Sequence, residues 1–372
     1  MKERNKNIDI VRSGALLLVL VYHFWVLSGS IAHTNILFID QFIKLGGEIG
    51  VTVFFILSGY GIYWSIDNAK SNGDFNYKRY MIKRLKRIVP EYYVCFILVL
   101  LLTDNAGYLY KDQFQNIWMH FLFIHNLSPD FASSINGVLW TMGVIFQFYL
   151  IAPLLYKVIK NQPYIILLIS FIFTCICKAI VYKFILYNNG LEAYSFYAGR
   201  QLLPTVLDNF ITGMFLAYII KNKKVKVYNH KRYILLLSTI IIFIIVYKMG
   251  LKYGIHSNNI SGYIWHSVLA LSLGSLIYAF STIKINMRNI GIRIILWIAK
   301  HEYSIYLWHL IVTINLINKA PIVSSLINKG GYILLFAVLL IITILVGYLF
   351  SILLHNSKFT QIFDKVDEKY IN

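Results

Sequence analysis

The sequence predicts an all-α, polytopic membrane protein with about ten transmembrane helices. Hydrophobic residues make up 58% of the chain and charged residues only 14%, whereas soluble domains carry about 25% charged residues. Apolar stretches long enough to span a bilayer, which takes about 20 residues, recur along the whole chain. The lysines and arginines gather in short runs between these stretches. No stretch is large or polar enough to form a soluble domain, so any chemistry must take place within the helical bundle.

Ten spans are expected in chain order, followed by a short charged tail. Their approximate bounds are 8–29, 45–66, 87–103, 138–157, 163–183, 200–220, 232–249, 260–280, 292–314 and 331–354. An apolar patch between the third and fourth spans, residues 118–125, is too short to cross and is expected to be re-entrant or interfacial. The spans are expected to form one transmembrane domain of residues 1–354, and residues 355–372 are expected to form a short cytoplasmic tail.

Charge distribution sets the expected orientation. With the N-terminus inside, the alternate loops that face the cytoplasm hold most of the 35 lysines and arginines, which is the bias seen in cytoplasmic loops. Both termini are therefore expected on the cytoplasmic side. The net charge of +19 does not indicate nucleic-acid binding, because the basic residues are dispersed over short loops. The three cysteines all fall in apolar spans, which argues against a disulfide framework.

The first span carries polar residues inside an apolar sequence. It contains Asp9, Arg12 and His23, and a charge at the centre of a spanning helix costs about 2.5–3.5 kcal/mol on insertion scales. At about 100° per residue, Arg12 and His23 project from one face. Either they form structural pairs, such as Arg12 with Asp9, or they belong to a functional polar stripe. A cleaved signal peptide is the rival interpretation, but the apolar region is too long and includes Arg12.

Glycines mark the second span and arginines precede the core of the third. The second span has glycines at positions 46, 47, 50, 59 and 61, which allow close helix packing, and the Ser58–Gly59 pair can open the backbone locally.

Before the third span, Arg84 and Arg87 lie one turn apart on one face. Such a pair suits a phosphate-bearing ligand, because guanidinium binds phosphate bidentately. The alternative is a basic cuff that binds anionic lipid headgroups.

Five motifs in these spans resemble those of the acyltransferase 3 family. The first three are DIVR followed by YH in the first span, GVTVFFILSGYGI in the second, and RLKRIVP before the third. The other two are LWTMGVIFQFYLIAPLL in the fourth span and EYSIYLWHLIV in the ninth. All five occur in the family's order, so the resemblance covers essentially the whole chain.

The chain departs from the family at Ile145, where Glu is common. If that Glu helps in catalysis, this chain lacks it or borrows Glu48 or Glu302. The flanking Val144 and Phe146 indicate that the neighbourhood has become apolar.

The resemblance implies an integral enzyme of the bacterial cytoplasmic membrane. Members take an acyl group, usually acetyl, from cytoplasmic acyl-CoA and pass it to a hydroxyl of a cell-envelope or exported polysaccharide or glycolipid. Proteins of polysaccharide synthesis are possible further partners. Because this sequence includes no esterase-like domain, direct transfer to the acceptor or to a separate protein is expected.

The candidate residues follow from the chemistry of this transfer. A hydroxyl that attacks a thioester needs a base of near-neutral pKa, a property of unperturbed histidine. His23 is therefore the candidate base or transient acyl carrier, and Arg12 is expected to orient the donor or stabilise an oxyanion. Arg84 and Arg87 are expected to bind the CoA phosphates.

Four further residues are candidates. His309, expected in the outer half of the ninth span, is either a second catalytic histidine or an aromatic-belt residue beside Trp308. Tyr149 is a candidate hydroxyl donor, as are Tyr303 and Tyr306. The remaining histidines show no metal-ligand spacing, and no metal is expected.

Two other functions remain open. The first is an exporter or flippase for a polysaccharide, since intramembrane charge also marks transport paths. No pair of broken helices in matching halves supports it. The second is a non-catalytic partner protein of the same fold, for which the loss of Glu at Ile145 would be the mark.

Overall fold

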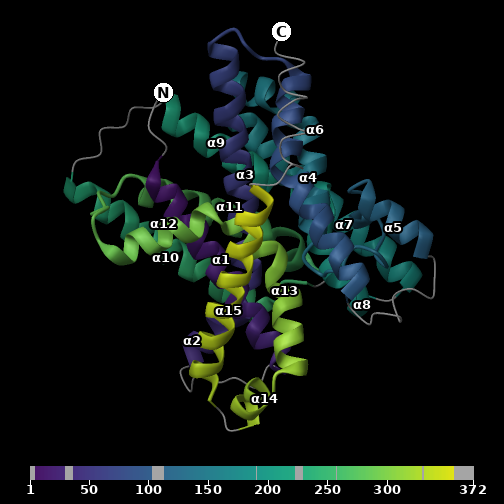
Figure 1. Ribbon diagram of the computed structural model, residues 1–372. Helices are drawn as coiled ribbons and strands as arrows, with labels where there is room; N and C mark the ends of the chain where they lie inside the picture. Colours follow the sequence, from purple (N-terminus) through teal and green to yellow (C-terminus); the bar gives the residue numbers. More distant parts are fainter. Residues whose placement is uncertain are drawn as a thin grey trace.

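The computed structural model describes residues 5–29, 37–102, 113–189, 191–222, 229–256, 258–328 and 331–355 (Figure 1). These residues form helices and connecting turns with no strand among them, which confirms the all-α fold class. Beyond His355, the expected charged tail lies outside the described residues. The described cysteines are free thiols.

Fifteen α-helices and three short helical turns make up the described part of the chain. The α-helices are α1 (Lys6–Leu27), α2 (Leu37–Lys44), α3 (Gly46–Ser71), α4 (Tyr77–Leu102), α5 (Gln113–Phe121), α6 (Trp140–Asn161), α7 (Pro163–Asn189), α8 (Leu191–Phe196), α9 (Leu207–Asn222), α10 (Asn229–Tyr253), α11 (Ile260–Ser281), α12 (Ile290–Lys300), α13 (Glu302–Lys319), α14 (Pro321–Asn328) and α15 (Tyr332–His355). The short turns are η2 (His125–Leu127), η3 (Tyr197–Gln201) and η4 (Leu203–Thr205).

Seven of the described helices are long and apolar enough to cross a membrane. They match the first, second, fourth, fifth, seventh, eighth and tenth expected spans. The seven segments are Lys6–Leu27, Gly46–Ser71, Trp140–Asn161, Pro163–Ile185, Lys231–Tyr253, Ile260–Ser281 and Tyr332–Leu354. The chain is thus a multi-pass membrane protein.

The other three expected spans are also helical, but each differs from a simple apolar helix. α4 contains Arg84, Arg87 and Glu91 within its sequence. The sixth expected span contains α9, which has 16 residues, and begins in the turns η3 and η4. The ninth is divided at His301 into α12 and α13. A count of ten spans therefore stays a prediction.

α1 lies at the centre of the bundle and contacts α3, α12, α13, α11 and α15 (Figure 1). In Figure 1 the first residues of α1 and the last of α15 lie toward one side, whereas α2 and α14 lie toward the other. This arrangement is compatible with two termini on one side of the membrane; which side they face stays a prediction.

Glycines bring α3 close to two neighbours. A Cβ atom on Gly46 or Gly50 would meet the backbone of α1, and one on Gly59 would meet the backbone of Phe210 in α9. Close packing through small residues is common between membrane helices. Gly61 differs from the other α3 glycines, because no atom lies within 4 Å of its Cβ position. α3 runs unbroken through Ser58 and Gly59, so the backbone does not open there.

Candidate active site

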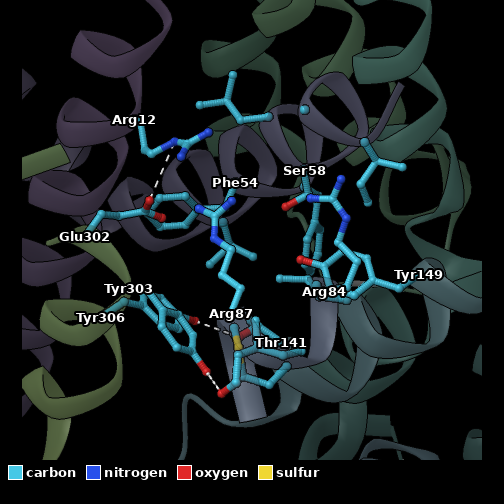
Figure 2. A pocket seen from close by; sticks show the side chains of 18 residues that line it. Arg12, Phe54, Ser58, Arg84, Arg87, Thr141, Tyr149, Glu302, Tyr303 and Tyr306 are labelled. Carbon is cyan, nitrogen blue, oxygen red and sulfur yellow. Dashed lines mark hydrogen bonds and ion pairs between the residues drawn. The ribbon is translucent and has the colours of Figure 1, made fainter. Parts of the chain in front are cut away.

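A cavity of about 100 Å³ lies among α1, α3, α4, α6 and α13. Figure 2 shows that polar side chains from these helices converge on it. Its lining residues are Arg12, Val51, Phe54, Phe55, Leu57, Ser58, Gly61, Ile62, Arg84, Arg87, Ile88, Thr141, Met142, Ile145, Tyr149, Glu302, Tyr303 and Tyr306. Six of the eight candidate residues named from the sequence line this cavity. The remaining two, His23 and His309, do not.

Arg12 pairs with a carboxylate on the neighbouring helix α13. Its Nε lies 3.6 Å from Oε2 of Glu302 in the first turn of α13 (Figure 2). Both side chains are largely buried, with 14% and 16% of their surfaces exposed. The structural pair expected from the sequence had Asp9 as the partner, whereas the ion pair in the cavity is made with Glu302.

Arg84 lies over two aromatic rings. Its guanidinium carbon is 5.4 Å from the ring centre of Tyr80 and 5.9 Å from that of Tyr149. The hydroxyl of Tyr80 donates to the backbone oxygen of Tyr149 at 3.2 Å, which joins the two rings. A guanidinium stacked on aromatic rings keeps its edge free for hydrogen bonding. Tyr149, expected as a hydroxyl donor, thus supports Arg84 with its ring.

Arg87 lies at the mouth of the cavity and is exposed. It is one turn beyond Arg84 on α4, and both side chains line the same cavity, as their spacing indicated. The hydroxyl of Tyr303 donates to the backbone oxygen of Ile88 at 2.7 Å and ties α13 to α4 beside this mouth. Two guanidiniums therefore reach one cavity from a single helix face.

Ile145 also lines the cavity. The sequence indicated an apolar neighbourhood, from its neighbours Val144 and Phe146, and this expectation stays a prediction, because the lining of the cavity contains both apolar and charged side chains. Successive residues of a helix point in different directions, about 100° apart, so adjacent residues do not report the surroundings of Ile145. The cavity contains one carboxylate, Glu302. Of the two carboxylates considered as replacements for the family Glu, only Glu302 is in this cavity.

Tyr306 connects the cavity to the two candidate histidines. Its hydroxyl is 3.1 Å from Oγ1 of Thr141, and its ring centre is 5.5 Å from that of Phe54. On the other side, the backbone oxygen of Tyr306 accepts a hydrogen bond from Nδ1 of His309 at 2.5 Å. The histidines therefore lie one helical turn of α13 beyond the cavity.

His23 and His309 contact each other directly. Nε2 of His309 is 3.2 Å from Nδ1 of His23, and the ring centres are 4.9 Å apart. His309 is fully buried and His23 is partly exposed. The aromatic-belt alternative for His309 required a position at the membrane interface, whereas this side chain lies inside the bundle.

The backbone oxygens beside His23 and His309 indicate which ring nitrogen of each carries the hydrogen when both side chains are neutral. Nδ1 of His23 faces the backbone oxygen of Val19 at 2.9 Å, and Nδ1 of His309 faces that of Tyr306. A carbonyl only accepts, so each Nδ1 carries a hydrogen. Nε2 of His309 is then an acceptor for the shared hydrogen of His23. Nε2 of His23 keeps its lone pair, and it is the atom that can take a proton.

The contacts Arg12–Glu302 and His23–His309 show that α1 and α13 run parallel to each other. Arg12 pairs with Glu302 at the start of α13, and His23 contacts His309 two turns further along. Both polar residues of α1 thus face one neighbouring helix, which agrees with the single face predicted from their spacing.

A second polar cluster lies inside the bundle, around Glu48. Its Oε1 is 2.9 Å from Nε2 of His256, and its Oε2 is 2.9 Å from Nε2 of His266. Arg200 forms an ion pair with the same carboxylate and donates to Thr52 Oγ1 at 3.1 Å. Glu48 does not line the cavity that contains Ile145, and its carboxylate has His256, His266 and Arg200 as partners.

The Glu48 cluster has the composition of a metal site but an unfavourable charge. One ligand atom from each of Glu48, His256 and His266 lies within 4.8 Å of the others. Arg200 already contacts the carboxylate, and a divalent cation would be repelled by this guanidinium. The donor set therefore fits a hydrogen-bonded network better than a cation, and the absence of a metal stays a prediction.

Arg200 and its buried neighbours carry a signal in the sequence that helical spacing alone does not pick out. Arg200 and His266 fall in expected spans, as do Lys178 and Asp208, and ionisable residues in a span are functional or paired by default. In the structure all four are buried. The spacing rule that joined Arg12 to His23 does not apply, because these residues come from different helices.

A family model described as an acyltransferase domain matches residues 5–352. The chain belongs to this acyltransferase family. The match confirms the resemblance based on the five motifs, and it extends across nearly the whole chain rather than the motifs alone.

Curated relatives of this acyltransferase carry related names. The chain is 27% identical over 336 residues to the peptidoglycan O-acetyltransferase OatA of Listeria monocytogenes, covering 82% of this chain and 48% of that one. It is 31% identical over 179 residues to the O-acetyl transferase of Shigella phage Sf6, covering 44% and 50%. The chain spans about half the length of each of these relatives. No solved structure matches it significantly.

Proposed function

We propose that this acyltransferase moves an acetyl group from acetyl-CoA to a hydroxyl of a cell-envelope or exported glycan. The observation that carries the proposal is the placement of Arg12, Arg84 and Arg87 around one cavity, one helical turn from the paired His23 and His309. The two relatives named as O-acetyltransferases support acetyl as the group transferred. The name of the Listeria relative supports a glycan as the acceptor.

The arginines fit the donor half of this reaction. Arg84 and Arg87 present guanidinium groups that bind phosphate bidentately, and acyl-CoA carries phosphates. A cavity of about 100 Å³ has room for a small group such as an acetyl thioester. Arg12, held by Glu302, is a donor of hydrogen bonds to the oxygen that gains charge when the thioester carbonyl is attacked.

The histidine pair fits the acceptor half. In the transfer, the hydroxyl oxygen forms a bond to the thioester carbon and the carbon–sulfur bond breaks. Nε2 of His23 takes the hydroxyl proton and returns it to the departing CoA sulfur, so charge and protons balance. His309 accepts the hydrogen of His23 Nδ1 and so fixes the orientation of the His23 ring. The third residue of a catalytic triad orients its general base in the same way.

A transfer assay with separated substrates tests this function. Membranes or vesicles that contain the protein receive acetyl-CoA labelled in the acetyl group, together with cell-envelope glycan stripped of its ester groups. Label that appears on glycan as a base-labile ester supports the proposal. Unchanged acetylation combined with loss of glycan export from cells that lack the protein would support an exporter instead.

A further inference from the structure

A second and larger cavity adjoins the candidate active site. It lies between α4, the junction of α12 with α13, and α15, and its volume is about 450 Å³. It shares three lining residues with the first cavity, namely Arg87, Glu302 and Tyr303. The two cavities are therefore adjacent at Arg87, Glu302 and Tyr303.

Basic side chains dominate the lining of this second cavity. Lys83, Lys86 and Arg87 come from α4, and Lys300 and His301 come from the α12–α13 junction. Lys83, Arg87 and Lys300 are exposed, so their charges face the opening. The balance of charge favours an anion.

Two carboxylates in the lining are already engaged. Glu302 forms the ion pair with Arg12, and Glu91 accepts a hydrogen bond from Ser304 Oγ at 2.8 Å. Since both have protein partners, they reduce the positive character of the cavity less than their number indicates.

The start of α13 adds to the positive potential. Glu302, Tyr303 and Ser304 are its first residues and all line the cavity. No side-chain hydrogen bond caps this helix start, and the N-terminal end of a helix carries a partial positive charge from its aligned peptide dipoles. His301, at the junction, is held by its Nδ1, which lies 2.8 Å from Ser351 Oγ on α15.

The two cavities differ in volume. Cavities that bind ligands of drug size have volumes of about 300–1,000 Å³. The second cavity is within this range at about 450 Å³, whereas the first is smaller, at about 100 Å³. A donor with a small acyl end and a large anionic end matches the pair.

We propose that the second cavity is the subsite for the 3′-phosphorylated nucleotide of the acyl-CoA donor, with Lys83 and Lys300 as phosphate-binding residues. This inference rests on the proposed function, because it assumes an acyl-CoA donor. The subsite predicts that the protein binds CoA more tightly than 3′-dephospho-CoA. Phosphate binding by Arg84 and Arg87 alone does not predict this difference. An anionic lipid headgroup offers the same phosphate chemistry and is the competing occupant.

Equilibrium binding in nanodiscs of phosphatidylcholine tests the subsite. Wild-type protein is expected to bind CoA about tenfold more tightly than 3′-dephospho-CoA, as one charge-assisted phosphate contact implies. The double variant Lys83→Ala/Lys300→Ala should lose this preference through weaker CoA binding alone. Lys284→Ala removes an exposed lysine that lines neither of the two cavities and should leave the preference intact.

The outcomes separate this inference from the proposed function. Equal affinity of the wild type for the two nucleotides would overturn the subsite, as would a preference that survives in the double variant. Phosphatidylglycerol that binds through the two lysines, without any nucleotide preference, would assign the cavity to lipid headgroups and also overturn it. If acetyl-CoA is consumed in all these cases, only the subsite is lost. Failure to bind or consume acetyl-CoA at all would instead overturn the proposed function.

Discussion

His309 donates from Nδ1 to the backbone oxygen of Tyr306 and offers its Nε2 to Nδ1 of His23 at 3.2 Å. The pair joins α1 to α13 and leaves Nε2 of His23 as the basic atom. A buried polar side chain is stable inside a bundle when its partners are present, and each ring here supplies one partner for the other. His309 is thus a positioning residue for the proposed base.

Replacing His309 tests this positioning role. His309→Phe keeps a ring but removes the acceptor, so we expect kcat for acetyl transfer to fall by about tenfold or more, because a misplaced general base loses part of its contribution. KM for acetyl-CoA should stay within about twofold, since the donor cavity lacks His309. His309→Gln can still accept from Nδ1 of His23 and should retain more activity. Equal losses in both variants, accompanied by low protein abundance, would assign His309 a structural role only.

Lysine substitutions distinguish a donor site from a basic cuff. Arg84→Ala and Arg87→Ala are each expected to raise KM for acetyl-CoA by about tenfold or more, since a charge-assisted hydrogen bond is lost. Arg84→Lys should restore activity only partly, because an ammonium lacks the planar group that stacks on Tyr149 and binds phosphate bidentately. Steady-state kinetics give the split between KM and kcat. Full recovery with lysine at both positions would favour the cuff.

Ile145→Glu tests whether this position faces a polar cavity. We expect membrane abundance within about twofold of wild type, because the new carboxylate would share the cavity with three guanidiniums. The matched control is Leu150→Glu on the same helix. Leu150 is 42% exposed on the outside of the bundle, where a carboxylate would meet lipid, so this variant should be depleted. Quantitative immunoblotting of membranes measures both. Equal depletion of the two variants would show that the cavity does not accommodate a carboxylate.

The sequence predicted those features that are set within a single helix. The common face of Arg12 and His23, and that of Arg84 and Arg87, follow from helical periodicity. Apolar length located the spans, but it did not reveal the division of the ninth span at His301, where no proline or glycine marks the break. The partners of these residues depend on which helices meet.

Contacts between distant segments explain the remaining differences. Glu302 was considered as a substitute carboxylate, but its pairing with Arg12 requires α1 and α13 to run side by side. The Glu48 cluster joins residues from α3, η3 and α11, and no spacing along the chain connects them.

The most direct test of the account is acetyl transfer by His23→Ala. A small neutral residue in a spanning helix removes a polar cost rather than adding one, so we expect normal membrane abundance. Acetyl-CoA binding should be unchanged, because His23 does not line the donor cavity. Labelled acetyl transfer to the glycan should fall by about a hundredfold or more, in line with the loss of a general base. An abundant variant that retains more than about a tenth of wild-type transfer would contradict the central role of His23.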